Sequence, residues 1–111
     1  MADFSFTQHD THPPLEAVLT DLNGPIDLST ATRVLLLLKG QKRTGAVSVA
    51  GECQIVDAEN GVIVYEWDPL DTAVADLYNA LFEIQWGDGT ESSVPNKGYF
   101  YVEFQPDLNS A

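Results

Sequence analysis

Closely spaced turn residues constrain this chain more than any other feature of its sequence. They recur at Asn23-Gly24-Pro25, Gly40, Gly45, Gly51, Asn60-Gly61, Asp68-Pro69, Asp88-Gly89 and Asn96-Lys97-Gly98. Glycine, proline and Asn/Asp-Gly pairs favour turns, so the segments between them have the length of strands. The spacing therefore predicts an all-β fold without a long helix.

Two of these segments alternate between apolar and polar positions, as a strand with one covered face does. In GVIVYEWD, which begins at Gly61, the residues on the apolar face are Ile63, Tyr65 and Trp67. In the second segment they are Tyr78, Ala80, Phe82, Ile84 and Trp86. The pair Asp88-Gly89 follows and suits a tight hairpin, from which the chain returns through 91–94 and the GYFYVEF segment.

Further strands are predicted nearer the N-terminus. LEAVLTD (15–21) and VLLLLK (34–39) have strand character, and VLLLLK is apolar on both faces, which indicates a central or covered strand. The segments 46–50 and 53–57 are weaker candidates. About seven antiparallel strands with short connections are typical of a β-sandwich, and 111 residues make one domain spanning 1–111.

A helix is the rival interpretation of residues 70–81. Apolar residues recur there at helical spacing, and Asp71 is a suitable N-terminal cap. A helical turn over 70–75 is compatible with this pattern. From Tyr78 onward, aromatic and β-branched residues and the hairpin that follows favour a strand.

The charge of the chain disfavours two classes of partner. There are 17 acidic and five basic residues, a net charge of −12, which repels nucleic acid and anionic lipid. No segment has the length of a bilayer span or the pattern of a secretion signal, so we expect a protein made in the cytoplasm. Arg33, Lys39, Lys42 and Arg43 lie within one short stretch, either as a basic patch or as ordinary solubilising charges.

The sequence predicts no catalytic residue, metal site or cofactor. Cys53 is the only cysteine, which excludes an internal disulfide, and it is best interpreted as a small core residue. His9 and His12 have a spacing found in zinc sites, but prolines follow directly and further ligands are not apparent. The acidic segments 57–59 and 68–71 lack the dense alternating oxygen ligands of a calcium loop.

Several pieces of the sequence, taken in order, resemble a known family. They are QHDTHPPLEAVLTD, NGPIDLSTAT, VDAENGVIVYEWDPLDTA and DLYNALFEIQWGDGTESSVPNKGYFYVEF. Together they are similar to the immunoglobulin-like domain at the N-terminus of phage upper baseplate proteins, which also occurs as small free-standing proteins of tailed phages and prophages. The resemblance covers nearly the whole chain, although each piece by itself is unspecific.

The resemblance implies an immunoglobulin-like β-sandwich, and the sequence departs from the family pattern at two positions. Asp76 stands where the family commonly has glycine, which is tolerable if the backbone there is left-handed. Arg33 stands at an apolar position, so we expect either a register slip near Val34 or a strand end open to solvent. The stretch from Asp71 to Tyr78 suggests a corner in which the tyrosine hydroxyl bonds to nearby backbone.

The resemblance also implies a non-enzymatic virion protein of a tailed phage, folded in the bacterial host cytoplasm, where a domain without a disulfide is expected. We expect a tail or baseplate component whose partners are other virion proteins, and a capsid decoration protein is the alternative. Exposed Trp67 or Trp86 would instead favour carbohydrate binding, although core packing is the better interpretation of both. The VLLLLK run, with Leu35 to Leu38, is either an interface, including one between copies of the chain, or a covered central strand.

Overall fold

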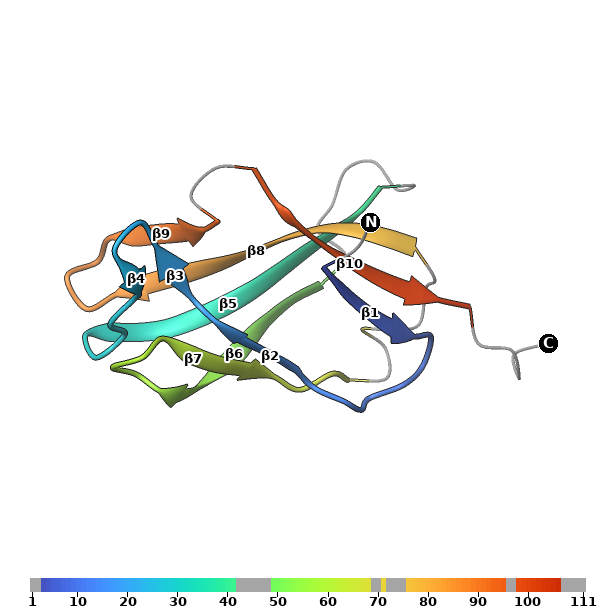
Figure 1. The fold of residues 1–111 in the computed structure, drawn as a ribbon, viewed down its shortest axis with the longest axis horizontal. Coiled ribbons are helices and arrows are strands. Elements are labelled where there is room, and N and C mark those ends of the chain that lie inside the picture. The colour runs from blue at the N-terminus through green and yellow to red at the C-terminus, as the bar shows by residue number, and fades with distance from the viewer. Residues whose placement is uncertain (1–2, 42–48, 69–70, 72–75, 96–97, 107–111) are drawn as a thin grey trace.

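The fold was obtained as a computed structural model that describes residues 3–41, 49–68, 71, 76–95 and 98–106. The molecule is elongated, with principal dimensions of 47 × 27 × 23 Å (Figure 1). The described residues form strands and turns, with no helix among them. The prediction of an all-β fold is confirmed.

The described strands are β1 (Phe4–Thr7), β2 (Leu15–Val18), β3 (Thr20–Asp21), β4 (Gly24–Pro25), β5 (Ala31–Gly40), β6 (Val49–Asp57), β7 (Val62–Tyr65), β8 (Asp76–Trp86), β9 (Glu91–Val94) and β10 (Phe100–Gln105). Most of them belong to one strongly curved sheet, in the order β1-β10-β8-β5-β6-β7-β2. In addition, β9 pairs with β8, and β3 pairs with β4 in a small separate hairpin.

The long strand β6 links the two halves of the sheet. Its first part pairs with β5, with Cys53 opposite Val34, and its last part pairs with β7, with Ile55 opposite Ile63. The sheet therefore curls until its end strands, β1 and β2, approach each other without pairing, which gives a nearly closed barrel (Figure 1).

One pair of strands contradicts the prediction that all strands are antiparallel. β1 runs parallel to β10, with Phe4 opposite Val102 and Phe6 opposite Phe104. The sheet is therefore mixed. Alternation within a strand shows which residues face the core but says nothing about the direction of the neighbouring strand, so the sequence pattern could not reveal this pair.

Several strands differ in extent from the predicted ones, and one was not predicted. The segment 15–21 is interrupted at Leu19, which is buried and donates its backbone N–H to the Gly61 carbonyl rather than to a ladder partner. The candidates 46–50 and 53–57 belong to one strand from residue 49 onward, and residues 46–48 lie outside the described part. The N-terminal strand β1 was not predicted by the alternation pattern.

The core lies inside the curl, and the two alternating segments supply much of it. Ile63, Tyr65 and Trp67 are buried, as are the inward side chains of β8 from Tyr78 to Ile84. Trp86 is only partly buried. The alternation therefore identified the covered face of both strands, apart from this last residue.

The two departures from the family pattern have different structural outcomes. At Arg33 the pairing of β5 with β8 shifts register between Ala31 and Arg33, and the Arg33 side chain is exposed. Both expected explanations therefore apply. Asp76 begins β8 in a strand conformation rather than a left-handed one, and its buried carboxylate accepts the Leu77 N–H at 2.8 Å. The left-handed backbone that would have made Asp76 a tolerable substitute for glycine is therefore not found there.

Tyr78 is buried in β8, beside Phe104. The helical turn predicted at 70–75 lies outside the described residues, except for Asp71. The same holds for most of the predicted tyrosine corner between Asp71 and Tyr78.

Candidate binding groove

A groove runs along the open side of the curled sheet. It consists of two adjoining hollows with volumes of about 630 and 410 Å³, and both are lined by Thr20, Val94 and Pro95. Because they share these residues, the hollows form one continuous depression, which we call the seam groove. A volume of this size is typical of ligand sites in proteins.

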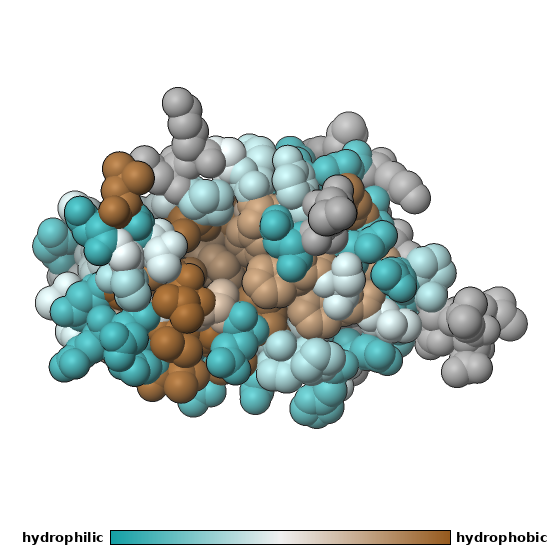
Figure 2. Space-filling view, in the orientation of Figure 1, coloured by the Kyte–Doolittle hydropathy of each residue, from teal (hydrophilic) through white to brown (hydrophobic). Residues whose placement is uncertain are grey.

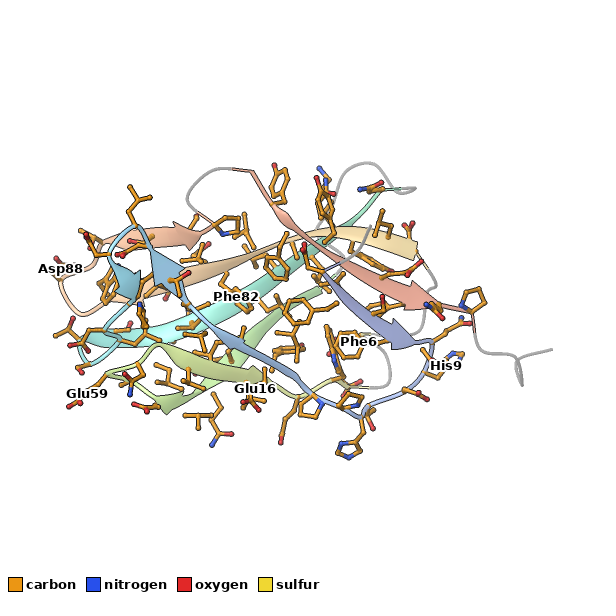
Figure 3. All side chains as sticks on the ribbon, viewed as in Figure 1. Phe6, His9, Glu16, Glu59, Phe82 and Asp88 are labelled. Atoms are coloured by element: carbon orange, nitrogen blue, oxygen red, sulfur yellow. The ribbon has the colours of Figure 1, made fainter. Side chains whose placement is uncertain are left out.

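The seam groove has two walls from distant parts of the sequence. One wall is formed by Val18, Leu19 and Thr20 and by the β3–β4 hairpin, and the other is formed by β9 and the start of β10. The floor is formed by Phe82 and Ile84 on the inward face of β8. Figure 2 shows this region as a hollow with predominantly brown, apolar atoms, and Figure 3 shows Phe82 in the centre of the molecule between β2 and β8.

Acidic side chains lie along the seam groove. Asp21 lines the larger hollow, and Asp3 lines the smaller one. Asp21 accepts the backbone N–H of Asn23 at 2.8 Å, and Asp3 accepts the N–H of Tyr101 at 2.8 Å. Among the described lining residues there is no lysine, arginine or histidine, so the charge that this surface presents is negative.

Trp86 lies where the seam groove meets a further hollow of about 640 Å³ beside the β8–β9 turn. Its indole Nε1–H donates to the Ser92 hydroxyl at 2.9 Å, which holds the ring against β9. The neighbouring Asp88 accepts from both the hydroxyl and the backbone N–H of Thr90, and these two bonds, the hydroxyl first, lower its pKa. The partly exposed indole ring of Trp86 is therefore bordered by the oxygen-bearing side chains of Asp88 and Thr90.

Trp67 is in a different situation, because it belongs to the core. It is 5% exposed and packs edge-to-face against Phe6, Tyr65 and Phe104, with ring centroids 5.0 to 5.2 Å apart. Its indole N–H has no hydrogen-bond partner among the described residues. Trp67 is therefore a packing residue, as the sequence favoured, and cannot stack on a ligand at the surface.

The two histidines do not line the seam groove. His9 and His12 are exposed in the connection between β1 and β2, and His9 lies at the opposite end of the molecule from Asp88 (Figure 3). His9 has a left-handed backbone, with φ of 70°. Within the described residues, no cluster of three or more His, Cys, Asp or Glu side chains is arranged to hold a metal ion.

The acidic segments singled out in the sequence form turns. In the first, the Asn60 amide donates to the Asp57 carboxylate at 2.8 Å. In the second, one Asp71 oxygen accepts both the Tyr65 hydroxyl, at 2.8 Å, and the Asp68 N–H, at 2.9 Å. These carboxylates close their own loops.

Cys53 is buried in β6, as expected for a core residue. Burial, and secondarily the neighbouring charge of Glu52, raises the pKa of its thiol to about 12. A thiol with this pKa stays protonated at neutral pH and is a poor nucleophile.

The VLLLLK run lies in β5, between β6 and β8. Val34, Leu36 and Leu38 are buried in the core, whereas Leu35 and Leu37 are partly exposed on the outer face. The inward face of this central strand is therefore covered by the core. For its outward face, with Leu35 and Leu37, the interpretation as an interface remains a prediction. The predicted basic patch is only partly described: Arg33 and Lys39 are exposed on β5, while Lys42 and Arg43 lie outside the described residues.

No protein-family model matches the chain, and no curated protein was found to be similar to it. Within the described residues, no helix has the length and hydropathy needed to cross a membrane.

The seam groove could not be predicted from the sequence because its lining residues come from five separate parts of the chain, within 3–4, 17–26, 82–86, 92–95 and 99–100. The local signals are three lining residues with exposed apolar or aromatic side chains, Val18, Leu22 and Tyr99. Its apolar floor and negatively charged rim make the seam groove a candidate binding surface.

Proposed function

We propose that this protein is a non-enzymatic binding module of a tailed-phage virion, placed in the tail or baseplate, where it docks to neighbouring virion proteins. The seam groove is the observation that carries the binding role, because a small protein rarely leaves an apolar depression between two sheet edges without use. The placement in a virion rests on the ordered resemblance of the sequence.

Two features of the strand pairing support the proposal that the domain is an immunoglobulin-like sandwich. A parallel pair formed by the first and last strands, β1 and β10, is compatible with that architecture. The division of β6 between two partners would let one strand connect the two layers. The immunoglobulin-like arrangement is therefore part of the proposal.

The lining of the seam groove supports a role without catalysis. Its described residues with a side-chain hydroxyl, amide or carboxylate are Asp3, Thr20, Asp21, Asn23, Ser92, Ser93 and Tyr99. None of the serines or threonines is placed beside a lining histidine or lysine that would activate it as a nucleophile.

The virion assignment is tested on particles. We expect the chain to co-purify with phage particles induced from the host strain that encodes it, as detected by mass spectrometry and by antibody. Cryo-electron microscopy of antibody-labelled particles would then show label at the tail tip. Label on the head would support the capsid alternative, and particles that lack the chain would refute both.

Carbohydrate binding is a second candidate, favoured by Trp86 alone. Its partly exposed ring, beside Thr30, Asp88 and Thr90, has the aromatic and oxygen-rich surroundings of a sugar-stacking site. In a fluorescence titration with glycans from the host surface, we expect quenching that Trp86→Ala removes. Unchanged fluorescence with every glycan would exclude this function.

A further inference from the structure

The edge of β8 is covered by two strands, only one of which has a neighbour on its far side. β10 pairs with the first part of β8 and β9 with the last part, on the same edge. Beyond β10 lies β1, paired with it through Phe4 to Thr7. Beyond β9, no strand of the described part of the chain is paired, so the backbone groups on that edge of β9 have no ladder partner there.

The opposite wall of the same space is also a strand edge. β2 ends the sheet and pairs only with β7, so its second edge faces the seam groove. Between the two edges lies the apolar floor, where Phe82, Ile84 and Trp86 project from alternate positions of β8. Side chains at every second position of an extended segment would meet this floor, because a strand also repeats every two residues.

The charge of the groove indicates which extended segment fits. Asp21 and Asp3 line its two hollows, and the described lining residues contain no basic side chain to offset them. A second copy of this chain carries the same net charge of −12, so repulsion between the two copies opposes self-association. The complementary occupant is a basic segment of another protein.

We propose that the seam groove binds an extended segment of a partner protein that has apolar residues at alternate positions and lysine or arginine at its ends. The segment adds a strand beside β9 and places its apolar side chains over Phe82 and Ile84, while its basic ends meet Asp3 and Asp21. Strand addition to an exposed edge obtains affinity from main-chain hydrogen bonds and specificity from alternate side chains. The inference rests on the proposed function and names the chemistry of the docking partner.

The test uses the full chain and a fluorescein-labelled, capped nonapeptide, KVTVTVTVK, in a fluorescence polarisation titration. We expect binding with Kd below about 1 mM. A peptide with glutamate at both ends should bind more weakly because the groove is acidic. A peptide with proline in place of each threonine should not bind, because proline lacks the N–H that pairs with a strand edge.

Matched variants locate the binding on the protein. Val18→Arg introduces a positive charge into the groove and should weaken binding about tenfold, the effect of losing a central interface contact. Val56→Arg is the control, since Val56 is 61% exposed on β6 and does not line either hollow. Circular dichroism verifies that both variants remain folded.

A second pair of variants tests the charge without disturbing a turn. Asp21→Asn keeps the oxygen that accepts the Asn23 N–H but removes the charge, so it should weaken binding at low salt. Asp27→Asn removes a charge from a similar turn, in which Asp27 accepts the Ser29 N–H at 2.9 Å, outside the groove. It should leave binding unchanged.

The inference is overturned by the absence of a polarisation change with about 1 mM peptide, by equal effects of Val18→Arg and Val56→Arg, or by equal affinity for the acidic peptide. Light scattering that shows a dimer lost in Val18→Arg would assign the groove to a second copy and also overturn it. The particle experiment is independent, because a chain found in particles that binds no peptide retains the proposed function while losing this inference.

Discussion

Gly61 lies at the closest backbone approach among the glycines whose φ is positive. Its φ is 69°, and a Cβ at this position would lie 2.7 Å from the Leu19 carbonyl oxygen and 2.8 Å from that of Ile26. Its own carbonyl accepts the Leu19 N–H at 2.8 Å. The residue thus holds the β6–β7 turn against the chain that connects β2 to β5.

We predict that Gly61→Ala lowers the free energy of unfolding by about 3 kcal/mol, because backbone strain and a steric clash add together. Gly98→Ala is the matched control: its φ is 75°, but nothing lies within 4 Å of the added Cβ. This variant should lose only about 1 kcal/mol. Urea denaturation measures both values, and equal losses would contradict the role of the clash.

Two buried titratable groups, the Cys53 thiol and the Tyr65 hydroxyl, should make the stability of the protein sensitive to alkaline pH. Burial raises the pKa of Cys53 to about 12, from an ordinary value of 9.0. Burial also raises the pKa of Tyr65, and its hydrogen bond to the Asp71 carboxylate raises it further. Both groups lose their protons more readily in the unfolded chain, so their contribution to stability is complete below about pH 9 and is lost as the pH rises toward 12.

We therefore expect the free energy of unfolding, measured by urea denaturation, to fall steadily above about pH 9. Cys53→Ala removes one of the two groups and should show a shallower decline. The native thiol should also react slowly with Ellman's reagent at neutral pH and rapidly after unfolding. A free energy of unfolding of the wild-type protein that stays constant between about pH 8 and pH 11 would contradict these pKa shifts.

At the scale of elements, β5 is the central strand, and its two faces have different roles. Leu36 is fully buried, whereas Leu37 lies on the outer face opposite Leu81 of β8. We predict that Leu36→Ala costs about 3 kcal/mol of unfolding free energy, through lost burial and a residual cavity. Leu37→Ala should cost about 1 kcal/mol or less.

Chemical denaturation of the two leucine variants distinguishes these faces. Equal losses would mean that the outer face is also covered, either by residues outside the described part or by a second copy. Light scattering at high protein concentration separates the two cases, because only self-association depends on concentration.

At the scale of the whole molecule, acidic loops gather at one end. The β3–β4, β4–β5, β6–β7 and β8–β9 connections meet there (Figure 1), and Glu59 and Asp88 mark this end in Figure 3. Asp21, Asp27 and Asp57 lie in or beside the same connections. With a net charge of −12, repulsion at this end opposes folding.

We predict that Glu59→Lys raises Tm at low ionic strength by about 4 °C, the shift expected for roughly 1 kcal/mol. At about 0.5 M NaCl the difference should nearly vanish, because exposed charges are screened. Lys39→Glu is the control of opposite sign. Thermal unfolding at both salt concentrations measures the effect, and a gain for Glu59→Lys that is independent of salt would show that its cause is not electrostatic.

Much of the local structure could be predicted from the sequence. Alternation placed Ile63, Tyr65 and Trp67 on a buried face, and Asp88-Gly89 marked the β8–β9 hairpin, where Gly89 has a φ of 88°. Both signals depend only on residues that are neighbours in the sequence. The first is the two-residue period of a strand, and the second is the backbone freedom of glycine in a turn. The prediction that Cys53 is a core residue followed from the same kind of local reasoning.

Only the tertiary structure decided which strands pair and what lies between them. The parallel β1–β10 pair joins Phe4 to Val102, and the seam groove joins Asp3 and Val18 to Phe82 and Val94. Which residues become neighbours depends on how the whole sheet curls and packs. That depends on contacts between residues far apart in the sequence, which no local pattern specifies. The sequence by itself therefore determined strands, turns and buried faces, whereas the groove exists only because the curled sheet stops short of closing.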